Sequence, residues 1–129
     1  ISNEDRVLAP LDKIEGRRVL VLGTSYKEGV KDERGSQVLK LIEHLKTKGY
    51  SVTALDPKFS KSMAIRAELN NHDTVIVTIP EGSFKDIGKQ LGEQIKVVLD
   101  FANVLDQECM PPQIRLWEAG RGWVNNTKQ

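Results

Sequence analysis

Short apolar runs alternate with amphipathic stretches along most of the chain. The first run, residues 18–22, is continuous and ends at Gly23, which is typical of a strand buried on both faces. Residues 24–35 carry glycines and charges, so we predict a long loop there. From Ser36 the apolar positions follow helical spacing, with Ser36 as the N-cap and Gly49 as the stop signal.

The same unit then recurs along the chain. Further apolar runs predict strands over 50–55, 74–79, 95–99 and an edge strand over 114–117, with helices over 60–70 and 84–91 between them. We expect the helix over 60–70 to point Met63, Ala64 and Ala67 inward. Alternating strands and helices predict right-handed crossovers and a mainly parallel sheet.

The expected fold is therefore α/β, a Rossmann-like three-layer sandwich around a mainly parallel five-stranded sheet of order 3-2-1-4-5. Ligands of open α/β sheets bind beyond the C-terminal ends of the strands, at the switch point of the strand order. In the order expected here, that point lies between strands 1 and 4. The loops after Leu22 and Leu99 would then flank the binding site.

The chain divides into three parts. Residues 1–16 are predicted to be a linker or the end of a longer helix, residues 17–119 the domain, and residues 120–129 a polar, frayed tail. The sequence opens on Ile1 rather than Met, and we expect it to be a piece of a longer protein.

Composition narrows the function classes. The 129 residues carry 19 Lys and Arg against 18 Asp and Glu, a formal net charge of +1, so we expect neither nucleic acid nor a membrane surface as partner. With Cys109 as its one cysteine, the chain forms no internal disulfide, which favours a reducing, cytoplasmic setting. We interpret Cys109 as structural and expect no catalytic residue here. His44 and His72 lack ligand-like spacing, so no metal site is expected.

The loop after the first strand departs from the usual dinucleotide fingerprint. That fingerprint places three glycines after the strand, the second of which lets a pyrophosphate approach the backbone. Here Gly23 is followed by Ser25 at the position of the second glycine, so we expect no cofactor to bind this domain. A generic NAD- or nucleotide-binding domain remains an alternative, because Asp56 follows strand 2 where a ribose-binding acid lies, although Asp56-Pro57 also fits a turn.

Instead of glycines, the loop carries charge and an aromatic ring. Lys27 and Arg34 can together meet a phosphate or sugar hydroxyls, with Tyr26 adding a packing surface. Asp32 can orient Arg34 or cap the loop. The other interpretation is that Asp32 and Arg34 form only a loop ion pair and that Lys27 is only solvated.

The strand, Gly23, Tyr26-Lys27 and the spacing Asp32-x-Arg34-x-Ser36 resemble the C-terminal domain of the UDP-glucose/GDP-mannose dehydrogenase family. The resemblance covers about residues 15–108, including the strand that ends in Asp56-Pro57 and the segment 100–106. It implies a parent enzyme that oxidises a nucleotide sugar with NAD and a catalytic cysteine. NAD would bind a separate N-terminal domain, and the parent would form a homodimer.

The same resemblance implies roles for the loop residues. Tyr26, Lys27 and Arg34 would bind the UDP- or GDP-linked sugar, while Gly23, Asp32 and Ser36 would shape the loop. The family often has an arginine where this chain has Ala102, so a divergent scaffold or dimerisation module of the same fold is a second hypothesis.

Overall fold

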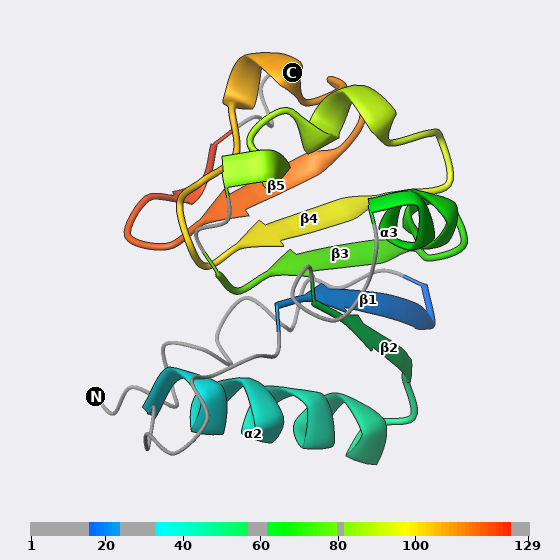
Figure 1. The fold of residues 1–129 in the computed structure, drawn as a ribbon, viewed down its shortest axis with the longest axis vertical. Coiled ribbons are helices and arrows are strands. Elements are labelled where there is room, and N and C mark those ends of the chain that lie inside the picture. The colour runs from blue at the N-terminus through cyan, green and yellow to red at the C-terminus, as the bar shows by residue number, and fades with distance from the viewer. Residues whose placement is uncertain (1–15, 24–32, 57–61, 80–81, 125–129) are drawn as a thin grey trace.

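The computed structural model describes residues 16–23, 33–56, 62–79 and 82–124. Its strands and helices alternate along the chain (Figure 1). The strands are β1 (Arg18–Leu22), β2 (Ser51–Leu55), β3 (Thr74–Val77), β4 (Val97–Asp100), β5 (Arg115–Glu118) and β6 (Gly122–Trp123). The helices are α2 (Glu33–Thr47), α3 (Ser62–Leu69) and the short 3-10 helices η2 (Gly82–Phe84), η3 (Ile87–Gln90) and η4 (Gln107–Cys109).

These elements form one sheet of order β2-β1-β3-β4-β5-β6, in which β1 to β5 are parallel and β6 is antiparallel to β5. The expected α/β class and mainly parallel sheet are confirmed. The expected order 3-2-1-4-5 is wrong, because β3 pairs with β1 and not with β2. Burial explains the difference: every residue of β3 is buried, whereas β2 is half-exposed and suits the edge.

The two faces of the sheet carry different elements. Helix α2 joins β1 to β2 and packs on one face, while α3 and the 3-10 segments, which make the later connections, pack on the other (Figure 1). The right-handed crossover rule requires this, since the chain moves one way from β1 to β2 and the opposite way afterwards. The result is the three-layer arrangement that the sequence predicted.

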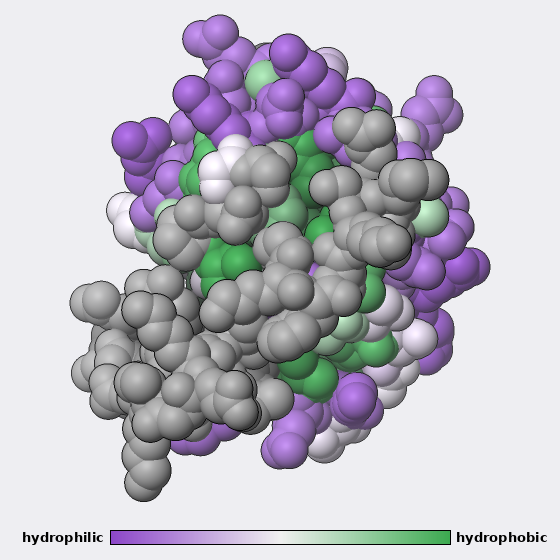
Figure 2. Space-filling model, viewed as in Figure 1, coloured by the Kyte–Doolittle hydropathy of each residue, from purple (hydrophilic) through white to green (hydrophobic). Residues whose placement is uncertain are grey.

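Two apolar clusters fill the space between the layers. One holds Leu41 and Leu45 of α2 against β1, and the other holds Ile65 and Leu69 of α3 against the opposite face. Ala67 was expected to point inward but is exposed, because the larger Ile65 and Leu69, four residues apart, set the buried face of α3. Figure 2 shows hydrophilic side chains along the rim of one face and hydrophobic ones toward its middle.

The predicted helix over 84–91 is replaced by the two 3-10 helices η2 and η3. Phe84, Ile87 and Leu91 are still buried, as the pattern indicated. Gly88 packs directly on the backbone of Cys109 and Met110, so the segment follows that contact instead of a continuous helix. No helix in the described part of the chain is long and apolar enough to cross a membrane.

The start of the predicted polar tail is ordered. Gly122 and Trp123 pair with β5 as β6, which makes β6 the edge strand in place of 114–117. The Arg115 guanidinium lies 4.4 Å from the centroid of the Trp123 ring. This cation–π contact adds to the backbone pairing with β5 in a segment whose polar composition indicated fraying.

Candidate functional site

The strand order places the switch point between β1 and β3. From the C-terminal end of β1 the chain leaves toward α2 on one face, and from β3 it leaves toward the 3-10 segments on the other. Neighbouring strands whose connections leave to opposite faces open a crevice beyond their C-terminal ends. The expected site between strands 1 and 4 is therefore corrected to β1 and β3, because β3 separates β1 from β4. Leu22 and Gly23, the last described residues before Glu33, lie at this end of β1.

Gly23 directly follows β1, at the switch point of the strand order. Its φ is +105°, a conformation that residues with a Cβ rarely adopt. A Cβ there would lie 2.6 Å from Ile79 Cγ1 and 2.7 Å from Thr78 Oγ1. The Gly23 N–H donates to the Leu55 carbonyl at 2.7 Å, so this residue is held between β2 and β3.

Thr78, which directly follows β3, hydrogen-bonds the last residue of β1 and Gly23. It is 7% exposed, and its backbone N–H donates to the Leu22 carbonyl at 3.0 Å. Its hydroxyl lies 3.0 Å from that carbonyl and also hydrogen-bonds the Gly23 carbonyl. The carbonyl groups of Leu22 and Gly23 are thus both held by Thr78.

Asp100 organises the segment that follows β4. Its buried carboxylate accepts hydrogen bonds from the backbone N–H groups of Ala102, Val104 and Leu105, at 3.1, 3.4 and 3.0 Å. Asn103, at the tip of this turn, has a φ of +55°. Ala102 is partly buried and packs against the core. It stands at the position where the resembled family often has an arginine.

Asp56 lies at the C-terminal end of β2 and is only 2% exposed. A carboxylate that receives ribose hydroxyls must present its oxygens to the ligand. Asp56 offers almost no such surface, which disfavours a dinucleotide-type ribose contact. Pro57, the other residue of the expected turn, lies outside the described residues.

The loop residues singled out from the sequence are only partly placed by the structure. Tyr26, Lys27 and Asp32 lie outside the described residues. Arg34 and Ser36 belong to α2, which begins at Glu33. The assignment of Ser36 as N-cap is therefore wrong, since it is the fourth residue of the helix, and the loop ends earlier than expected. Arg34 lies in the first helical turn, where unpaired backbone N–H groups favour an anion.

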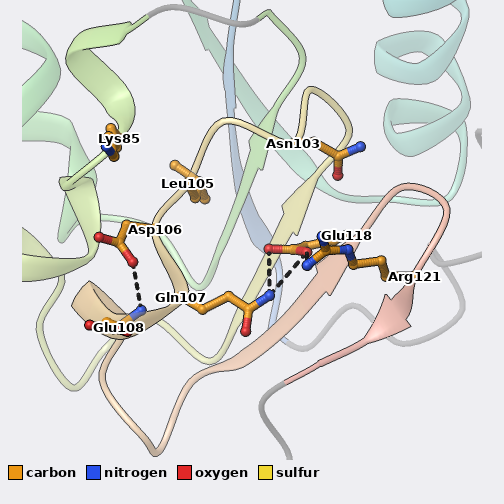
Figure 3. Close-up of a pocket in the computed structure, with 8 residues that line it drawn as sticks. All are labelled: Lys85, Asn103, Leu105, Asp106, Gln107, Glu108, Glu118 and Arg121. Atoms are coloured by element: carbon orange, nitrogen blue, oxygen red, sulfur yellow. Dashed lines mark hydrogen bonds and ion pairs between the residues drawn. The ribbon is translucent and has the colours of Figure 1, made fainter.

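A polar pocket of about 550 Å³ opens beyond the C-terminal ends of β4 and β5 (Figure 3). Within it, Gln107 Nε2 donates to both Glu118 oxygens at 3.2 and 3.3 Å, and Arg121 pairs with Glu118 at 3.4 Å. The Glu108 N–H donates to Asp106 at 2.9 Å. These groups engage one another and carry charges of both signs. The pocket is lined by Lys85, Asn103, Leu105, Asp106, Gln107, Glu108, Glu118 and Arg121.

The surroundings of Cys109 disfavour its thiolate form. Partial burial and then the negative charge of Asp106 raise the pKa of its thiol, against the opposing charge of Lys89. His72 is buried, with Nδ1 2.8 Å from the Glu68 carbonyl oxygen, which is a structural contact. Within the described ranges, no group of three or more His, Cys, Asp or Glu side chains is placed to hold a metal ion.

The sequence alone did not identify Thr78 and Asp100 as residues that organise this edge of the sheet. Thr78 was predicted as one more residue of the strand over 74–79, although a hydroxyl two residues before Pro80 was the available signal. From the sequence, Asp100 was predicted only as part of the segment 100–106 that follows the fourth strand. Its three backbone hydrogen bonds depend on the path of the following turn, which composition does not show.

The chain is similar in sequence and fold to several known proteins. Protein CapL from Staphylococcus aureus is 27% identical over 117 residues, which cover 81% of this chain and 28% of the relative. UDP-glucose 6-dehydrogenase from Rickettsia conorii is 26% identical over 84% of this chain and 31% of its own length. The solved structure of UDP-D-ManNAc dehydrogenase from Pyrococcus horikoshii superposes with a TM-score of 0.61 and 25% identity, over 89% of this chain and 28% of that one.

The chain thus spans less than a third of the length of these relatives. Residues 20–107, more than half of the chain, match the family model described as the UDP binding domain of the UDP-glucose/GDP-mannose dehydrogenase family. That stretch begins within β1, includes the loop after it and ends in η4. The family resemblance inferred from the loop is confirmed, and the chain belongs to the UDP-glucose/GDP-mannose dehydrogenase family, in which it corresponds to the UDP binding domain.

Proposed function

We propose that this chain is the nucleotide-sugar-binding domain of an NAD-dependent UDP-glucose/GDP-mannose-type 6-dehydrogenase and that it has no dehydrogenase activity alone. The observation that carries the proposal is the family match over residues 20–107. Relatives with this pattern include dehydrogenases named for UDP-glucose, UDP-N-acetyl-D-glucosamine and UDP-N-acetyl-D-mannosamine. A nucleotide sugar is therefore the ligand class that this domain is expected to bind.

The chemistry of the loop supports the same ligand. Lys27 supplies a point charge for a phosphate, and Arg34 adds a guanidinium at the start of α2. Tyr26 provides a flat surface for packing. An open α/β sheet receives its ligand at the switch point of the strand order, which here lies at the C-terminal ends of β1 and β3.

NAD belongs to another part of the parent enzyme in this proposal. Ser25 replaces the glycine at which a pyrophosphate would approach the backbone, and the buried Asp56 offers no ribose contact. The described residues include one cysteine, whose raised pKa disfavours the thiolate. A preceding NAD-binding domain and a second copy of the parent chain are the partners we propose.

A ligand panel tests the proposal. The chain is titrated with UDP, UDP-glucose, GDP-mannose and NAD while its thermal unfolding is followed. A ligand that binds only the native state raises the midpoint, so we expect UDP and at least one nucleotide sugar to stabilise the domain and NAD to leave it unchanged. Stabilisation by NAD alone would contradict the proposal and favour a generic dinucleotide-binding domain.

The variant Lys27→Ala tests the loop directly. Loss of a charge-assisted contact worth about 1.5–3 kcal/mol should weaken UDP binding at least tenfold without unfolding the domain. Lys48→Ala is the matched control, because Lys48 is an exposed lysine at the opposite, N-terminal edge of the sheet. Equal UDP affinity in the Lys27 variant and the wild type would remove Lys27 from the site.

A non-catalytic scaffold or dimerisation module is the second candidate function. The observation in its favour is Ala102, which packs against the core at a position where the family often has an arginine. The same panel separates the two candidates. If the domain is folded and none of the nucleotides raises its midpoint of thermal unfolding, the scaffold function is favoured.

A further inference from the structure

We propose that Thr78 is a positioning residue for the nucleotide: its hydroxyl fixes the direction in which the chain leaves β1 and so sets the affinity for the UDP portion of the ligand. This inference rests on the proposed function. Thr78 itself is nearly buried and is not expected to touch the ligand. Its action runs through Gly23, the first residue of the loop that carries Tyr26 and Lys27.

The contacts of Thr78 all go to the last two residues before the loop. Its N–H donates to the Leu22 carbonyl at 3.0 Å, and its hydroxyl lies 3.0 Å from the same oxygen. The hydroxyl also hydrogen-bonds the carbonyl of Gly23. One hydroxyl proton serves one acceptor at a time, and the Leu22 carbonyl already has the backbone donor. Among the described residues, Thr78 is the donor to the Gly23 carbonyl, whereas the Leu22 carbonyl has a backbone donor as well.

Gly23 leaves little freedom for another arrangement. It is buried, its φ is +105°, and its N–H is held by the Leu55 carbonyl at 2.7 Å. Loss of the Thr78 hydroxyl would leave the Gly23 carbonyl without this donor in a buried place, and such a group is costly unless the chain moves. The expected response is a shift of the peptide after Gly23, which is where the loop begins.

The pairing of β1 with β3 does not involve this hydroxyl. The register between β1 and β3 closes at the pair Leu22–Val77, one residue before Thr78. A valine at position 78 keeps the branched shape of threonine and the backbone N–H bond to Leu22. The hydroxyl is thus separable from packing, and it lies at the crevice between β1 and β3 that the ligand is proposed to occupy.

The experiment measures UDP binding by calorimetry at a temperature where every variant is shown to be folded. Thr78→Val is expected to weaken UDP binding about tenfold, and Thr78→Ser, which restores the hydroxyl, to stay within about twofold of wild type. Ile76→Val, in the same strand but within the apolar core, is a control for destabilisation alone and should bind UDP as wild type does. If Thr78→Val fails to fold, the comparison of Thr78→Ala with Thr78→Ser replaces it.

The outcomes separate this inference from the proposed function. If wild type binds UDP and the variants without the hydroxyl bind equally well, Thr78 has no positioning role and the proposed function stands. If Ile76→Val weakens binding as much as Thr78→Val, the effect is one of stability and the inference fails. If wild type does not bind UDP or a UDP-sugar, the proposed function and this inference fail together.

Discussion

Asp73 shows how one side chain joins two strands at the N-terminal edge of the sheet. Its Oδ2 accepts hydrogen bonds from the backbone N–H groups of Arg17 and Arg18 at 3.0 and 3.1 Å, where the chain enters β1. Partial burial opposes ionisation, but these two backbone donors and the charge of Arg18 outweigh it and lower the pKa of Asp73. Asp73 itself precedes β3, so its carboxylate bridges the starts of β1 and β3.

A lowered pKa makes the stability of the domain depend on pH. The contribution of Asp73 is present above its unfolded pKa, about 3.9, and is lost as the pH falls through the lower folded value. Asp73→Asn should therefore reduce the free energy of unfolding by about 1 kcal/mol at pH 7 and flatten its decline below pH 4. Urea unfolding from pH 7 to pH 2.5 measures this. Glu93→Gln, an exposed acid near the same edge, serves as control. A decline as steep in Asp73→Asn as in wild type would contradict the assignment.

At the residue scale, the sequence predicts where a residue lies within an element better than it predicts which residues it contacts. Gly23 is identified as the end of the first strand because a glycine closes an apolar run. That it is wedged against Thr78 and Ile79 depends on which strand lies beside β1, and the run itself does not tell this. Ser36 was wrong as an N-cap, since the polar, charged residues before it were assigned to the loop although α2 begins among them, at Glu33.

Gly88 decides the form of the segment between β3 and β4. A Cβ at this position would lie 2.6 Å from the Cys109 carbonyl oxygen and 2.9 Å from Met110 Cα. These are backbone atoms, so a larger side chain cannot be accommodated by a rotamer change. The close contact joins η3 to the residues of η4, which lie after β4.

Gly88→Ala therefore tests packing against helix propensity. Alanine favours a helix over glycine by about 1 kcal/mol, yet overpacking against backbone costs about 1–3 kcal/mol. We expect Gly88→Ala to lower the free energy of unfolding in urea, whereas Gly82→Ala, with open space around its Cβ, should change it by less than about 1 kcal/mol. Stabilisation by Gly88→Ala would show that this segment prefers a regular helix.

Elements with strong periodicity were predicted well, and those shaped by contacts were not. The bounds of β1 match the continuous apolar run, because a strand buried on both faces must be apolar throughout. For the helix expected over 84–91, the buried positions were predicted correctly but the form was not. The contact of Gly88 with the backbone of Cys109 and Met110 accounts for the difference. Strand β6 was missed because it has only two residues, and its pairing with β5 and the contact of Arg115 with Trp123 are not visible in its own sequence.

At the scale of the whole molecule, the class of fold follows from the alternation of strands and helices, but the order of the strands does not. Both orders satisfy the crossover rule. What separates them is that β3 is buried along its whole length and β2 is not, a difference that the sequences Thr74–Val77 and Ser51–Leu55 do suggest. The corrected order moves the expected binding position to the C-terminal ends of β1 and β3, where Leu22 and Gly23 lie.

The central claim is that a nucleotide binds at the C-terminal ends of β1 and β3. An NMR titration of the labelled chain with UDP tests it most directly, since each backbone amide reports on its own surroundings. We predict that the amides of Gly23 and Ile79, beside the crevice, shift progressively with UDP, while those of Arg17 and Gly49, at the opposite edge of the sheet, remain in place. Shifts confined to the opposite edge, or a spectrum that UDP leaves unchanged, would contradict the claim.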